Sequence, residues 1–297
     1  MNRLCVFLVV VSVACFFSGG VTADDVPPSA SRVEEFVYKK TPQGDLRMHV
    51  HFPESWDAAD RRPAIVFFFG GAWRAGSVEQ FLPQAEHFAG RGMVAARADY
   101  RVKSRHGTTP DKCVEDGKSA VRWLRTNAAR LGVDPRRIVA AGGSAGGHVA
   151  ACTAVIPGFN ADGEDTAISA KPNLLVLYNP VLDCVPIGRR FGMEDMARKI
   201  SPNHHLTREV PATIIFFGTE DRLNEGGKAF IEKAGPLGIR AEMYMAADQK
   251  HGFFNRPPWL QRTTYLADEF LARHGYLQGP PTVSLPDGRL AMSRWKP

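Results

Sequence analysis

The sequence predicts an α/β fold built on a doubly wound, mostly parallel sheet of eight strands, with an antiparallel hairpin at its N-terminal edge. Two observations lead to this prediction. Short apolar runs alternate along the chain with segments of helical periodicity, as in sheets whose parallel strands are connected by helices. Ahead of them, two alternating runs flank a Pro/Gly turn at residues 41–45, a pattern that indicates a hairpin.

The strands follow from these runs. The hairpin strands are expected at residues 36–39 and 46–52. Six further strands are expected at residues 64–69, 93–98, 138–141, 174–178, 212–217 and 241–245. Several of them are apolar at every position, which is typical of strands covered on both faces.

The helices are expected between these strands. Their predicted ranges are about 79–90, 110–131, the residues after 144, about 226–235 and about 260–274. In the second of them, apolar side chains recur at helical spacing and Gly132 follows as a stop signal. The segment 183–210 lacks a regular pattern and is expected to be irregular.

Both ends of the chain differ in composition from the middle. Residues 1–23 combine Arg3, an apolar run and a small-residue cleavage site, which predicts an export signal. The apolar run is too short for a comfortable membrane span, which needs about 20 residues. We therefore expect a secreted or periplasmic protein with no stable membrane span after cleavage, a folded domain over residues 24–276 and a Pro-rich tail over residues 277–297.

Composition and charge exclude some classes of protein. The chain is 44% hydrophobic and 23% charged, as in ordinary globular proteins. The net charge is +6, but basic and acidic residues are mixed throughout, which argues against nucleic-acid binding. Cys113, Cys152 and Cys184 follow the signal. They allow either one disulfide and one free thiol or three buried free thiols, and a structural role is expected.

The candidate nucleophile is Ser144. An apolar β-type run enters Gly142-Gly143-Ser144-Ala145-Gly146, and a run of small residues typical of a helix leaves it. A serine on so sharp a strand-to-helix turn has strained backbone angles, and glycines are needed on both sides of it. The alternative is a glycine-rich turn with an incidental serine.

A serine hydroxyl needs an imidazole to take its proton and a carboxylate to orient that imidazole. In an open parallel sheet such groups lie beyond the carboxyl ends of strands. Asp221 and His251 follow two of the predicted strands there. Asp183 also follows a strand and is an alternative acid, whereas His148, on the helix after Ser144, is expected to pack against a neighbour. The histidines lack the spacing of metal ligands, so we expect no metal and no cofactor.

Developing negative charge on the substrate oxygen needs backbone N–H donors. The amide of Ala145, directly after the nucleophile, is one candidate. The others are the amides of Gly71 and Ala72 in the loop Phe69-Gly70-Gly71-Ala72-Trp73.

From about Phe36 to His274 the chain resembles the α/β-hydrolases. Within them it is similar to the bacterial esterases related to hormone-sensitive lipase, and most of all to exported acetyl xylan and feruloyl esterase-like members. The resemblance rests on Gly70–Trp73, Gly142–Gly147, Gly218–Asp221 and His251–Phe253.

The resemblance implies a serine carboxylic-ester hydrolase that works through an acyl-enzyme. It also implies short acyl esters, such as acetylated saccharides, as substrates. One departure concerns the oxyanion loop, because the family has His-Gly-Gly-Gly where this chain has Phe69-Gly70-Gly71-Ala72. Phe69 removes a polar side chain that helps to fix the loop, and the Cβ of Ala72 restricts positive φ.

Two other functions are compatible with the sequence. One is a non-catalytic binding protein of the same fold, and the other is a lipase-like or peptidase-like hydrolase. Only about ten residues separate the predicted signal from the first strand. We therefore expect no large cap domain and an open site, covered at most by residues 183–210. The sequence makes no prediction of oligomeric state.

Overall fold

The structure is a computed structural model that describes residues 32–190, 192–285 and 291–297. The strands in these residues form one sheet in the order β1-β2-β4-β3-β5-β6-β7-β8-β9. Their bounds are β1 Val33–Thr41, β2 Gly44–His51, β3 Arg62–Phe68, β4 Val94–Ala98, β5 Val133–Gly143, β6 Leu174–Tyr178, β7 Ala212–Gly218, β8 Ala241–Ala246 and β9 Ser293–Trp295. Strands β3 to β8 are parallel, and β1, β2 and β9 supply the antiparallel pairings. The predicted α/β class and N-terminal hairpin are confirmed.

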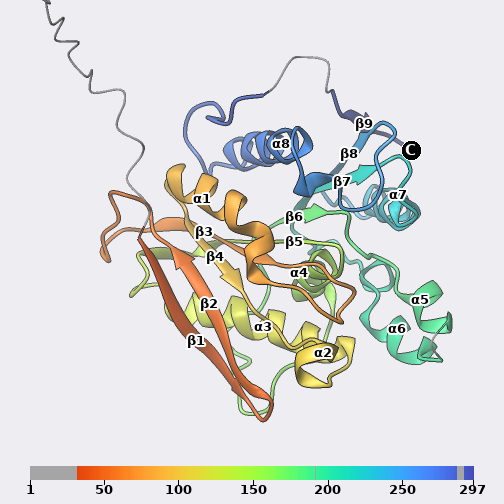
Figure 1. Ribbon diagram of the computed structural model, residues 1–297, viewed down its shortest axis with the longest axis horizontal. Helices are drawn as coiled ribbons and strands as arrows, with labels where there is room; N and C mark the ends of the chain where they lie inside the picture. Colours follow the sequence, from red (N-terminus) through yellow and green to blue (C-terminus); the bar gives the residue numbers. More distant parts are fainter. Residues whose placement is uncertain (1–31, 191, 286–290) are drawn as a thin grey trace, which may run out of the picture. The chain divides into compact units, whose positions relative to one another are not determined.

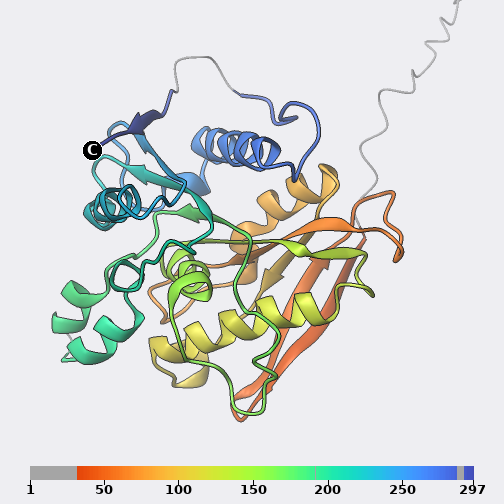
Figure 2. The same ribbon diagram turned by 180° about the vertical axis from the view of Figure 1, so that it is seen from behind.

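Helices cover both faces of the sheet (Figures 1 and 2). Their bounds are α1 Leu82–Gly90, α2 Lys103–His106, α3 Pro110–Thr126, α4 Ala145–Val155, α5 Val185–Arg190, α6 Glu194–Ile200, α7 Asn224–Ala234 and α8 Trp259–Arg273. The described residues also include the short 3₁₀ helices η2 Val78–Phe81, η3 Pro202–His204 and η4 Phe253–Asn255. Helices α1 and α8 contribute buried side chains to one face, and α3, α4 and α7 to the other.

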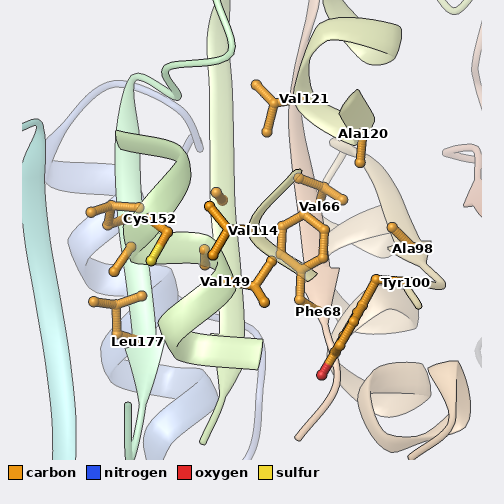
Figure 3. Packing of buried hydrophobic residues seen from close by; sticks show 14 of the residues in the cluster. Val66, Phe68, Ala98, Tyr100, Val114, Ala120, Val121, Val149, Cys152 and Leu177 are labelled. Carbon is orange, nitrogen blue, oxygen red and sulfur yellow. The ribbon is translucent and has the colours of Figure 1, made fainter. Parts of the chain in front are cut away.

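The alternation of side chains along the strands produces two cores. In β3, Val66 and Phe68 belong to the core under α3 and α4, whereas Ile65 and Phe67 belong to the core under α1 and α8. Figure 3 shows the first core, where Val149 of α4 lies among the residues packed around Phe68. Because both faces are buried, these strands read as continuous apolar runs.

In the residues that the structure describes, the sheet has nine strands, so the prediction of eight was wrong by one. Residues Ser293–Trp295 of the tail form β9, which pairs antiparallel with β8. Leu277 and Met292 of the same tail are buried against the core under α8. A run of three residues is too short to show the alternation that predicts a strand, and its position is set by the exposed edge of β8.

Residues 183–210 are also more regular than expected, because they contain α5, α6 and η3. In the described part of the chain this segment adds no large cap, as expected. The predicted export signal, residues 1–23, lies outside the described residues. Within the described ranges, no helix combines the length and the apolar character needed to cross a membrane.

Cys113, Cys152 and Cys184 are free and buried. The structure thus corresponds to the second of the two alternatives, three buried thiols. Burial raises the pKa of all three thiols. Since the thiolate is the reactive form, these cysteines are chemically quiet parts of the core.

Candidate active site

Ser144 stands on the turn between β5 and α4, with φ 54° and ψ −118°. This conformation is strained for a residue with a side chain. The neighbouring glycines are required by space: a Cβ on Gly142 would overlap the carbonyl oxygen of Gly146, and a Cβ on Gly146 would overlap that of Phe68. The turn therefore holds Ser144 at the carboxyl end of the sheet.

The structure brings Ser144, His251 and Asp221 into one hydrogen-bonded line. Nε2 of His251 lies 2.9 Å from Oγ of Ser144, and its Nδ1 lies 2.8 Å from Oδ2 of Asp221. Asp221 lies in the loop after β7 and is 3% exposed, whereas His251 follows β8 and its side chain is 43% exposed. In this geometry the imidazole can take the serine proton while the buried carboxylate orients it.

Asn179, which the sequence analysis missed, completes the surroundings of the acid. Its Nδ2 donates to Oδ2 of Asp221 at 2.8 Å, and its Oδ1 accepts from the amide of Gly252 at 3.2 Å. The amide of Leu223 donates to the other carboxylate oxygen at 2.9 Å. Asn179 is fully buried at φ 44°, directly after β6. The sequence feature that could have identified Asn179 is the Asn-Pro pair directly after the predicted strand 174–178.

The alternative acid lies elsewhere. Oδ1 of Asp183 accepts from the amide of Val185 at 2.9 Å and lies 4.0 Å from Nε2 of His204. Within the described residues it makes no hydrogen bond to His251. Asp183 therefore accepts a hydrogen bond from the first residue of α5 and does not orient the catalytic histidine.

His148 is buried beneath the oxyanion loop. Its Nδ1 accepts from Nε1 of Trp73 at 3.1 Å, and its Nε2 lies 2.8 Å from the carbonyl oxygen of Ile200. Desolvation lowers the pKa of His148 to about 4, so the ring is neutral at pH 7. With both nitrogens engaged, this histidine packs against its neighbours, as the sequence predicted, and connects the oxyanion loop to the end of α6.

The oxyanion loop passes directly beside the nucleophile. A Cβ on Gly70 would come within 3.2 Å of the Cβ of Ser144. In the described part of the chain, the amides of Gly71 and Ala72 donate no hydrogen bond. Ala145 is the first residue of α4, where an amide has no acceptor within the helix. Backbone donors are therefore available on two sides of Ser144.

Ala72 adopts the conformation that its Cβ disfavours. Its φ is 54°, and the following Trp73 has φ 57°. The loop is closed by Gly71, whose carbonyl oxygen accepts from Arg74 at 2.9 Å and from Ala75 at 3.2 Å. These turns hold two residues in left-handed conformations, each costing roughly 1–3 kcal/mol.

Phe69, which stands where the resembling family has histidine, fixes the loop by packing. Its buried ring stacks on Tyr100 with centroids 4.2 Å apart, and the Tyr100 hydroxyl donates to the carbonyl oxygen of Phe69 at 2.6 Å. A Cβ on Gly76 would overlap the Phe69 ring. Aromatic packing thus holds the loop in place of the polar side chain that Phe69 removes relative to the resembling family.

Comparison with known proteins gives a consistent result. Residues 48–187 match the family model BD-FAE. Esterase 2 of the planctomycete Thermogutta terrifontis is 46% identical, with 84% of this chain and 94% of that chain covered and a TM-score of 0.78. Further structures of that esterase have propionate bound or are phosphorylated by paraoxon. The carboxylesterase NlhH of Mycobacterium tuberculosis is 25% identical over 75% of this chain and 76% of its own length.

Proposed function

Because this chain belongs to the BD-FAE family of α/β-hydrolase esterases, we propose that it hydrolyses short-chain acyl esters with Ser144 as nucleophile, His251 as base and Asp221 as orienting acid. The observation that carries the proposal is the hydrogen-bonded line from Ser144 Oγ through His251 to Asp221. Beside it lie the amides of Gly71 and Ala72, which donate no hydrogen bond within the described residues.

The reaction begins when Oγ of Ser144 attacks the acyl carbon and its proton passes to Nε2 of His251. Negative charge develops on the former carbonyl oxygen, where the amides of Gly71, Ala72 and Ala145 can donate to it. Collapse of the tetrahedral intermediate breaks the ester C–O bond, and His251 returns its proton to the leaving alcohol. An acyl-serine remains.

Water then attacks the acyl-serine, and His251 takes a proton from it. The second tetrahedral intermediate expels Oγ of Ser144, which recovers a proton from His251, and the carboxylic acid leaves. His251 carries each proton in this sequence. The proton that restores the Ser144 hydroxyl comes from the attacking water.

Short acyl groups are supported by the comparison with the Thermogutta esterase. Structures of that protein have propionate or butyrate bound. Since it is 46% identical to this chain, we propose acyl groups of similar length here.

For the alcohol part of the ester we propose a saccharide, so that the substrates are acetylated saccharides. The support is the resemblance to acetyl xylan and feruloyl esterases and the lack of a large cap over the site in the described residues.

We further propose export of the chain through residues 1–23. Fractionation of cells that express the full chain, with N-terminal sequencing of the product, tests this: a mature protein beginning at Asp24 is expected, and a cytoplasmic full-length chain contradicts it.

The activity is tested with p-nitrophenyl acetate, butyrate and palmitate and with acetylated xylan, using Ser144→Ala as control. We expect turnover of acetate and butyrate esters, acetate release from the polymer and none of these with the variant. Preference for palmitate would favour the lipase-like alternative. Absence of both turnover and labelling of Ser144 by paraoxon would favour the non-catalytic alternative.

A further inference from the structure

Two side-chain amides outside the triad connect the oxyanion loop to the loop of His251. Gln80 lies on η2, and its Oε1 accepts from the amide of Gly70 at 2.6 Å. Its Nε2 donates to Oδ1 of Asn255 at 3.0 Å. Asn255, on η4, donates from Nδ2 to the carbonyl oxygen of Gly252 at 2.9 Å. The two residues are 175 positions apart in the sequence.

The connection continues to the catalytic acid. The amide of Gly252 donates to Asn179, and Asn179 donates to Asp221. From Gly70 to Asp221 each hydrogen bond runs in the same donor-to-acceptor direction. The carbonyl and the N–H of Gly252 belong to two successive peptide groups, so Gly252 joins the two halves of the series through its backbone position. A shift of Gly252 therefore changes the hydrogen bonds on both sides of it.

The hydrogen bond between Gln80 and Asn255, here called the amide bridge, lies above a pair of packed aromatic rings. These rings, and not the amide bridge, hold the two 3₁₀ helices together. Phe81 and Phe254, the sequence neighbours of Gln80 and Asn255, stack with ring centroids 5.7 Å apart. Both are buried, and a Cβ on Gly143 would come within 3.2 Å of either ring. The aromatic pair thus holds η2 and η4 together from inside, whereas the amide bridge lies on the outside, with Gln80 half-buried and Asn255 exposed.

We propose that Gln80 and Asn255 are positioning residues that keep the oxyanion amides in register with His251. Neither touches the reacting atoms. Gln80 fixes Gly70, whose neighbour Gly71 supplies a candidate oxyanion donor, and Asn255 fixes Gly252, the residue after His251. This inference rests on the proposed function, because a positioning role requires the reaction that it serves.

The test compares Gln80→Ala, Asn255→Ala and the double variant for hydrolysis of p-nitrophenyl butyrate. We expect each single variant to lower kcat about threefold to thirtyfold, since small misplacements of catalytic groups are costly. KM should stay within about twofold. The double variant should be no slower than the slower single variant, because both changes break the same link. The thermal midpoint should fall by no more than about 3 °C in Asn255→Ala, whose hydrogen bonds are exposed. In Gln80→Ala it should fall by up to about 6 °C, because the part-buried amide of Gly70 loses its acceptor.

Two further variants sharpen the result. Gln80→Glu keeps an acceptor for the Gly70 amide but has no proton to donate to Asn255 near pH 8, so it should be as slow as Gln80→Ala. Gln249→Ala is the matched control and should retain the parent kcat. Among the described residues, Nε2 of Gln249 donates one hydrogen bond, to the carbonyl oxygen of Ala247 in its own loop.

The outcomes distinguish the two proposals. Parent-like kcat in the single variants, parent-like kcat in Gln80→Glu, or additive losses in the double variant would each overturn the coupling and leave the esterase assignment intact. A parent protein without turnover that depends on Ser144 would overturn both.

Discussion

Asn179 and Asp221 share a hydrogen bond of 2.8 Å that ends on the carboxylate oxygen facing His251. The same asparagine side chain accepts from the amide of Gly252. One buried residue therefore orients both the acid and the loop that carries the base. Its φ of 44° is tolerated by asparagine better than by most other residues with a side chain.

Asn179→Gly tests this role, because glycine keeps the positive φ and removes only the side chain. We expect kcat to fall about 10- to 100-fold, as a hydrogen bond to a charged group and the alignment of His251 are lost together. KM for p-nitrophenyl butyrate should change little. Parent-like kcat in a folded variant would show that Leu223 and the buried site suffice to orient Asp221.

Ala72→Gly addresses the strain in the oxyanion loop. The Ala72 side chain is exposed, so the change acts through φ 54° alone. Relief of left-handed strain outweighs the greater freedom of glycine in the unfolded chain, and we expect a gain of roughly 0.5–1 kcal/mol in the free energy of unfolding.

Ala75→Gly is the control for this prediction. Ala75 is also exposed in the same loop but is not among the residues with positive φ. The same substitution should therefore lower the free energy of unfolding by roughly 0.4–1 kcal/mol. Urea unfolding measures both variants, and a loss of stability in Ala72→Gly would contradict the assigned strain.

Phe69→His restores the residue found in the resembling family, and we expect it to be harmful here. The imidazole would lie in an apolar slot against Tyr100, and burial of a polar ring without partners costs about 1–3 kcal/mol. Phe69→Leu keeps the slot apolar and should be less destabilising. Thermal unfolding ranks the three proteins, and a more stable histidine variant with higher kcat would show that the loop still accepts the polar anchor.

The residues that sequence reasoning reached are those whose requirements are local. The glycines around Ser144 reflect a steric need of a single turn, and Asp221 and His251 follow strands whose ends must meet at one edge of a parallel sheet. Each is visible in a stretch of about six residues. The same logic predicted the class of the fold.

What the sequence could not predict depends on contacts between distant segments. Gln80 and Asn255 are ordinary polar residues until the sheet brings η2 and η4 together. Strand β9 depends on the free edge of β8 rather than on its own three residues. From the sequence, Phe69 was expected only to remove a polar side chain that helps to fix the oxyanion loop. Its stacking on Tyr100, which fixes the loop instead, is evident only in the folded structure.

The buried His148 predicts a loss of stability in acid. Its pKa is about 4 in the folded protein and about 6.5 when unfolded. Between these values the unfolded chain binds the proton that the folded chain excludes, so stability rises with pH. The contribution is fully present above about pH 6.5 and is lost as the pH falls toward 4, on the order of 3 kcal/mol in total.

His148→Gln isolates this contribution. A glutamine can accept from Trp73 and donate to the carbonyl oxygen of Ile200, but it does not titrate. His51, whose pKa burial also lowers to about 4, remains in both proteins and cancels from the comparison. Urea unfolding at pH 7.5 and pH 5 should show a larger loss for the parent than for the variant. Equal losses would mean that His148 is protonated in the folded state, and its bond to Trp73 would then need another explanation.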